Sequence, residues 1–198
     1  KMILNERVKE RLELQNGILS AADVVSMGFS RNLLSVYVRE GLLVRVKQGL
    51  YSLPDWMEDD MFTLARGYPR MVFSHESALF LNGLSDRTPF IHAVSIPKNT
   101  SLSAAQREKC ICHYVKPEFY DMGIITRKTV FANEVRCYNA ERTICDLVRA
   151  KNKTDIETLT AALKNYAASK DKNVALLGSY ASSLKVIKEI QMYMGVLL

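Results

Sequence analysis

Apolar residues recur one helical turn apart at the start of the chain, within residues 2–15, and charged residues lie between them. This pattern predicts an amphipathic helix that packs on a core through Ile3, Leu4, Val8 and Leu12. Two further helical stretches follow, over residues 21–27 and 31–40. Serine caps and terminating Asn-Gly or Gly signals divide the three helices from one another: Asn16-Gly17, Ser20, Gly28, Ser30 and Gly41.

The pattern then changes from a period of 3.6 to a period of two. Residues 43–47 alternate along one strand, Gln48-Gly49 is a plausible tight turn, and residues 50–53 form the return strand, which Pro54 closes. Three helices followed by a hairpin within about 50 residues are typical of a winged helix-turn-helix. We therefore predict such a domain over residues 1–55.

The remaining residues, 56–198, mix strand and helix signals and predict a larger second domain of mixed α/β structure with a helical tail, which makes the whole chain α+β. An acidic stretch at 55–61 marks the boundary or the first turn of a connecting helix through Arg66. The further elements expected are helices at 74–84, 139–151, 154–168 and 173–194, and strands at 92–97, 109–115 and, as a pair, within 123–138.

Composition is that of an ordinary globular protein: 48% of the 198 residues are hydrophobic and 24% are charged. The net charge of +6 suits a polyanionic partner but does not identify one. No apolar run approaches the roughly 20 residues that span a bilayer, and no signal peptide is recognisable, so we expect no membrane association and a cytoplasmic location. The four cysteines are then expected to be free thiols.

The third predicted helix is the candidate reader of DNA, because its polar side chains fall opposite Leu34, Tyr37, Val38 and Gly41 on a helical wheel. Arg31 and Asn32, in the first turn, have the residue types that pair with guanine and adenine in the major groove. The hairpin would add phosphate contacts. The complete predicted DNA-binding set is Ser30, Arg31, Asn32, Ser35, Arg39, Arg45, Lys47 and Gln48. The alternative is that these are ordinary solvated charges on a winged helix that binds another protein.

Three short motifs contain residue types that are used in catalysis or metal binding, but their arrangement fits neither. Cys110-x-Cys112-His113 places both thiols on one face of a strand and the imidazole on the other, which disfavours joint zinc ligation. Ser74-His75-Glu76 points its side chains in different directions, and Asp59-Asp60 lies in a polar linker, where both carboxylates are expected to be solvated. No nucleotide-binding or metalloprotease motif is present. The sequence therefore predicts no enzyme activity, metal or cofactor.

Segments in both predicted domains resemble the AbiEi family of antitoxins from bacterial abortive-infection toxin–antitoxin systems. In the first domain the resemblance is carried by the helix from Ser30 to Gly41 and by EGLLVRVKQGLYSLP (40–54). In the second it is carried by FSHESALFLNGLSDRTP (73–89), HAVSIPK (92–98) and YNAERTICDLVRA (138–150). The order of these segments is more specific than the wing alone, and the resemblance covers nearly the whole chain.

This resemblance implies a transcriptional autorepressor that binds inverted-repeat promoter DNA through its N-terminal domain. It also implies a C-terminal antitoxin domain that counters a toxin with a nucleotidyltransferase fold, in a type IV system that needs no stable toxin complex. From the residues alone, Lys98, Arg127 and Lys128 are possible additional contacts to the DNA backbone, or else scattered solubility charges. The alternative function is a one-component transcription factor whose C-terminal domain senses a ligand.

Overall fold

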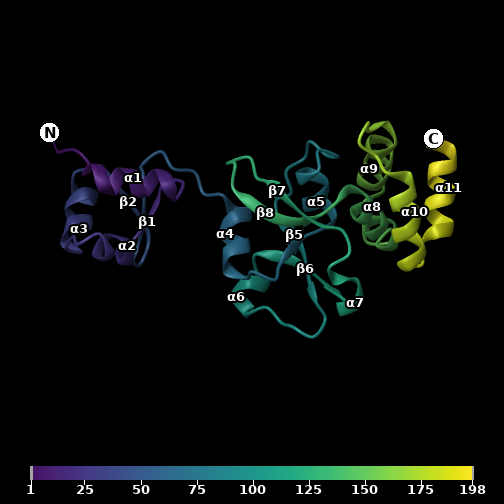
Figure 1. The fold of residues 1–198 in the computed structure, drawn as a ribbon, viewed down its shortest axis with the longest axis horizontal. Helices are drawn as coiled ribbons and strands as arrows, with labels where there is room; N and C mark the ends of the chain where they lie inside the picture. Colours follow the sequence, from purple (N-terminus) through teal and green to yellow (C-terminus); the bar gives the residue numbers. More distant parts are fainter. Residues whose placement is uncertain (1, 198) are drawn as a thin grey trace. The chain divides into compact units, whose positions relative to one another are not determined.

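The computed structural model describes residues 2–197, with every side chain in that range except that of Lys47. The chain forms two compact units that meet between Glu58 and Asp59, and Figure 1 shows helices and strands in both. The mixed α+β class predicted from the sequence is confirmed. None of the described helices is long and apolar enough to cross a membrane.

The first unit packs three helices against a small antiparallel sheet. Its elements are α1 (Glu6–Leu14), β1 (Ile18–Ser20), α2 (Ala21–Ser26), α3 (Asn32–Arg39), β2 (Val44–Lys47) and β3 (Leu50–Ser52). The strand order is β1-β3-β2, so the hairpin of β2 and β3 is joined by a short strand that the sequence pattern did not predict. The core consists of residues from all three helices and the sheet, with Val8, Leu12, Leu19, Val24, Leu34, Tyr37 and Leu43 almost fully buried.

The first helix starts later than the apolar pattern predicted. It begins after Asn5, whose side chain accepts a hydrogen bond from the backbone N–H of Arg7 at 3.1 Å. Ile3 lies before this cap and is 78% exposed, so its predicted place in the core is wrong. An asparagine that satisfies a free N–H of the first turn is a stronger start signal than an apolar residue at the right spacing.

The turn between α2 and α3 follows its sequence signals closely. Ser20 and Asp23 cap the start of α2 reciprocally through their side chains and backbone N–H groups. At its end, Gly28 has φ of 86°, a left-handed conformation that glycine adopts without strain, and its N–H donates to Val25. This tight exit redirects the chain into α3 after only a few residues.

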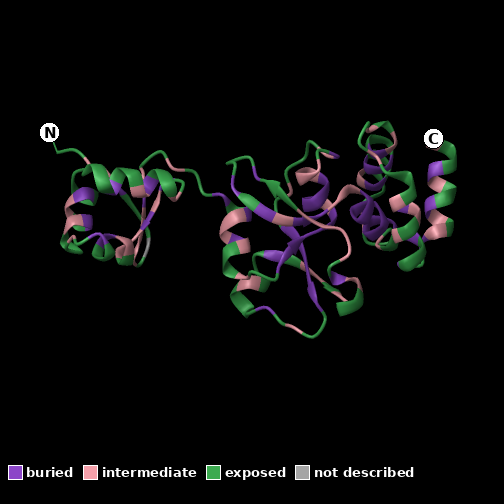
Figure 2. Cartoon of the chain, in the orientation of Figure 1, coloured by how far each residue is buried: buried purple, intermediate pink, exposed green. Residues whose placement is uncertain are grey.

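The second unit is built around a five-stranded mixed sheet with the order β6-β5-β4-β8-β7. Its strands are β4 (Val72–Phe73), β5 (His92–Pro97), β6 (Cys110–Val115), β7 (Ile124–Lys128) and β8 (Glu134–Tyr138). Its helices are α4 (Asp60–Gly67), α5 (His75–Leu81), α6 (Ala104–Arg107), α7 (Pro117–Tyr120), α8 (Ala140–Arg149), α9 (Ile156–Ala168), α10 (Val174–Ser183) and α11 (Ile187–Leu197). Figure 2 shows the interior strand β5 buried along its length and helix α8 buried over most of its length.

Helix α8 belongs to the helical core of this unit. All residues from 141 to 148 are buried, and the helix contacts α5, α9 and α10. The helical layer of α8 to α11 forms one core, while the sheet and α4 form most of the other. The single helix predicted over 173–194 is wrong, because the chain turns at Lys185, with φ of 60°, and begins α11 two residues later.

Candidate nucleic-acid interface

Helix α3 exposes the polar flank that the sequence predicted for it. Leu34 and Tyr37 are 1% and 2% exposed and hold the inner face against the core. The side opposite them carries the predicted DNA-reading residues, and the described side chains of Arg31, Asn32, Ser35 and Arg39 are exposed. Val38 was expected on the core side but is 36% exposed. The helix therefore presents both a polar surface and one apolar side chain to solvent.

Helix α3 has one hydrogen bond to the turn before it and one to the start of α1. Ser30 Oγ accepts a hydrogen bond from the backbone N–H of Asn32 at 3.3 Å, but the N-cap residue of α3 is Arg31, which makes no side-chain cap, so the prediction of Ser30 as the cap is wrong by one residue. The hydroxyl of Tyr37 accepts one from the backbone N–H of Asn5 at 3.0 Å, which joins the inner face of α3 to the start of α1. These contacts hold the helix on the unit and leave the side chains of Arg31 and Asn32 exposed.

One of the predicted phosphate contacts has a neighbouring carboxylate. Arg39 Nε lies 3.6 Å from Glu40 Oε1, with side chains that are 74% and 42% exposed. An exposed ion pair of this kind contributes roughly 0–1 kcal/mol. A phosphate can therefore replace Glu40 as the partner of Arg39 at small cost.

The wing carries Arg45 and Gln48 as exposed residues, whereas the side chain of Lys47 lies outside the described part of the structure. Its tip is anchored, because the N–H of Ala21 donates to the carbonyl of Gly49 at 2.9 Å. The register shifts after Arg45: Arg45 pairs with Tyr51 but Lys47 pairs with Leu50. Strict alternation, which would place Arg45 and Lys47 on one face, is thus interrupted by a bulge.

Arg7 adds a cation that sequence reasoning did not find. Its guanidinium carbon lies 5.6 Å from the centre of the Phe29 ring, and Phe29 directly precedes Ser30 in the turn before α3. Arg7 is exposed and therefore extends the cationic surface around the start of α3. No local signal could reveal this position, because residues on α1 reach the turn only through the tertiary fold.

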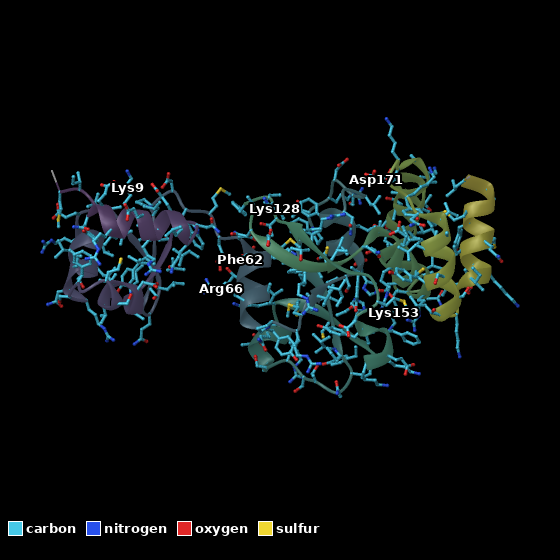
Figure 3. The ribbon with its side chains drawn as sticks, viewed as in Figure 1. Lys9, Phe62, Arg66, Lys128, Lys153 and Asp171 are labelled. Carbon is cyan, nitrogen blue, oxygen red and sulfur yellow. The ribbon has the colours of Figure 1, made fainter. Side chains whose placement is uncertain are left out.

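The candidate cations of the second unit gather at one end of its sheet. Strands β5 and β7 both run antiparallel to β4, since β4 and β8 are parallel, so Lys98 after β5 and Arg127 and Lys128 in β7 lie at the same end. All three are exposed, and Figure 3 labels Lys128. Strands β5 and β7 are three strand spacings apart in the sheet, roughly 14 Å. Glu134 lies opposite Lys128 in the register and offsets part of its charge.

The chain enters the second unit at this same end of the sheet. Asp59, the N-cap of α4, accepts hydrogen bonds from Thr129 at 2.5 Å and Asn133 at 2.9 Å, both in the turn between β7 and β8. Asp59 is therefore a buried structural residue, and the prediction that it is solvated is wrong. The link to the first unit thus leaves the second unit beside Arg127 and Lys128.

The cysteine and histidine motifs occupy structural positions. Cys110 and Cys112 pack with the core on the α4 side of the sheet, while the ring of His113 stacks on that of His75 at 3.6 Å on the other side. All four cysteines are free. Burial raises the pKa of Cys110 and Cys112. Among residues 2–197, no three His, Cys, Asp or Glu side chains gather as a metal site.

The prediction that Ser74 and His75 point in different directions is wrong, because their side chains are in contact. Ser74 Oγ lies 3.0 Å from His75 Nδ1, but Ser74 is fully buried and out of reach of a substrate. Burial, with smaller contributions from His113, Arg142 and Arg149, lowers the pKa of His75 to about 3. The imidazole is therefore neutral at physiological pH.

Comparison with known proteins supports both units of the fold. Residues 6–54 match a family model described as "Transcriptional regulator, AbiEi antitoxin". The crystal structure of the RV2827C protein from Mycobacterium tuberculosis superposes with a TM-score of 0.51 at 14% sequence identity, covering 96% of this chain and 80% of that one. At this identity the likeness concerns the fold alone. No curated protein sequence matches the chain significantly.

Proposed function

We propose that this chain, whose residues 6–54 form a domain of the AbiEi antitoxin family of transcriptional regulators, is an antitoxin that represses its own operon. The N-terminal unit would read inverted repeats in promoter DNA. The C-terminal unit would counter a toxin with a nucleotidyltransferase fold, without a requirement for a stable complex, as in type IV systems. The observation that carries this proposal is the exposed polar flank of α3 on a domain of that family.

The division of work within the interface follows from position. Arg31 and Asn32 lie at the start of α3, where a recognition helix meets base edges, and each would contribute roughly 1–3 kcal/mol of discrimination. Ser35, Arg39, Arg45, Lys47 and Gln48 would bind phosphates and supply affinity without sequence preference. Arg7 would join this second group. Lys98, Arg127 and Lys128 would add backbone contacts from the second unit.

The test uses the full chain and a labelled duplex from immediately upstream of its own gene. Arg31→Ala with Asn32→Ala should bind this duplex no better than a scrambled one, while Lys9→Ala, which removes a charge from an exposed side chain of α1, should retain the preference. Arg45→Ala should weaken binding to both duplexes equally and reduce the salt dependence by about one counterion. Retention of the sequence preference by the double variant would refute the assignment of α3 as the reader.

The antitoxin role is tested separately in cells that express the neighbouring toxin. The Arg31→Ala, Asn32→Ala variant should lose repression but still rescue growth, because the proposed antitoxin surface lies in the other unit. Loss of both activities in this folded variant would refute the division of labour. If no nucleotidyltransferase is encoded beside the gene and a small molecule releases the promoter duplex, the chain is a ligand-sensing transcription factor instead.

A further inference from the structure

The two edges of the five-stranded sheet differ in a way that the DNA-binding proposal does not explain. Strand β7 ends in Arg127 and Lys128, and charged residues of this kind keep an exposed edge from pairing with other chains. Strand β6, at the opposite edge, reads CICHYV over six residues, with no charged residue and no proline. It pairs with β5 without a register shift, so no bulge twists the edge away.

Strand β6 also exposes an apolar side chain on each of its faces. Ile111 is 50% exposed and Tyr114 is 49% exposed, and their side chains point to opposite faces of the sheet. A six-residue edge strand that is apolar, regular and uncovered normally pairs with another chain, because its outward N–H and C=O groups otherwise meet only water. The edge therefore has the properties of a template for an added strand.

A groove of about 550 Å³ runs along this edge. One wall is formed by consecutive residues of β6, from Ile111 to Val115. Because neighbouring side chains of a strand alternate between faces, a groove lined by all five follows the open backbone edge. The other wall is the last turn of α8 and the turn after it, with Arg149, Asn152 and Lys153. A groove between an edge strand and a helix is the setting in which extended peptides are bound.

The charges of the groove select the kind of peptide. Its one carboxylate, Asp146, is bound by Arg142 Nε at 2.9 Å inside the unit. The stacked His75 and His113 are neutral, because burial lowers the pKa of both. Arg149 and Lys153 are exposed and form no ion pair within residues 2–197. The carboxylate of Glu76 lies near the groove, where its charge acts on His113. Lys153 is labelled in Figure 3.

We propose that the groove between β6 and the end of α8 binds an extended, acidic peptide segment of another protein, which pairs with β6 as a sixth strand. Main-chain hydrogen bonds to the β6 edge hold the segment, and Arg149 and Lys153 select its carboxylates. A second copy of this chain is a poorer occupant, because each copy would bring the same two cations to the shared edge. The proposal does not depend on DNA binding.

The experiment pans a random twelve-residue peptide display library against the full chain. Enriched peptides should contain β-branched residues and Asp or Glu. Measured by fluorescence anisotropy, their affinity should fall at least about tenfold for Ile111→Lys, which places a charge on the edge, and remain for Thr126→Lys on the β7 edge. Circular dichroism shows whether the variants are folded. The double variant Arg149→Glu, Lys153→Glu should select basic peptides instead.

Backbone methylation distinguishes strand pairing from other modes of binding. An added strand bonds to the edge through the N–H groups of every second residue, so methylation of one alternate set of amides should abolish binding and methylation of the other set should not. Several outcomes would overturn the proposal: no peptide enriched over an unrelated protein, equal binding by the Ile111→Lys variant, or equal effects of both methylation sets. A dimer that sedimentation finds and Ile111→Lys dissociates would assign the edge to a second copy.

Discussion

Protonation of His75 should make the second unit sensitive to mild acid. The side chain is 7% exposed, its ring stacks on His113, and its Nδ1 contacts Ser74 Oγ. Burial chiefly lowers the pKa from 6.5 to about 3, and His113, Arg142 and Arg149 lower it further in the same direction. The folded unit therefore keeps this imidazole neutral at a pH where the unfolded chain has already bound a proton.

The sign and size of the effect follow from this difference in proton uptake. Between pH 6.5 and about 3 the unfolded state binds more protons at His75 than the folded state, so stability falls as the pH falls. From pH 7 to pH 5 the loss of unfolding free energy amounts to about 2 kcal/mol. That is a large fraction of the roughly 5–15 kcal/mol that stabilises a typical domain.

The assay compares the wild type with His75→Asn by urea unfolding at pH 7 and pH 5. Asparagine suits the left-handed backbone at this position, where φ is 48°, and it does not titrate in this range. The one tryptophan, Trp56, lies in the first unit and reports on that unit by fluorescence. A change in circular dichroism without a change in fluorescence then reports the unfolding of the second unit. His92 and His113, whose pKa burial also lowers, remain in both proteins.

The expected result is that the variant loses about 2 kcal/mol less than the wild type between the two pH values, whatever its stability at pH 7. The comparison removes the shared contributions of the other histidines. If both proteins lose the same free energy, His75 takes up its proton at an ordinary pH in the folded state, and the reasoning from its burial is refuted.

Two further changes test the packing of each unit. Gly17→Ala should destabilise the first unit by about 1–3 kcal/mol more than Gly41→Ala does. Both positions have positive φ, but only a Cβ at Gly17 would lie 2.7 Å from Trp56 Cδ1. Equal midpoints of urea unfolding, measured by fluorescence, would contradict this prediction. Asp146→Asn should lower the unfolding free energy of the second unit by about 3–5 kcal/mol, measured by circular dichroism. The reason is that Arg142 would remain a buried charge without its partner. A loss below about 1 kcal/mol would mean that Arg142 needs no counterion.

The fold of the first unit could be predicted largely from its sequence, because its signals are local. Ser20 and Gly28 act on the backbone within a few residues, and the apolar spacing of α3 selects Leu34 and Tyr37 for the core. The exposed flank of that helix follows directly from the same spacing. These features need no knowledge of which segments meet in space.

The errors arise where tertiary contacts or the local backbone override the periodic pattern. The bulge after Arg45 cannot be recognised from alternating residues, and it shifts the register of the wing between Arg45 and Lys47. The break at Lys185 interrupts an apolar stretch that reads as one helix. The two-residue strand β4 is too short to show a period, yet it is the strand that joins the halves of the sheet.

Surfaces of the second unit depend on strand order, which a periodic pattern does not encode. The stretch CICHYV (110–115) has the apolar character of a buried strand, and β5 with a similar character is indeed buried along its whole length. Only the order β6-β5-β4-β8-β7 makes one of them an open edge and brings Arg149 and Lys153 beside it. An apolar strand without charges is ordinary at the centre of a sheet, and the same composition at an edge is a template for pairing with another chain. The position of β6 in the sheet, more than any motif within it, is therefore what suits this segment to the added strand that we propose.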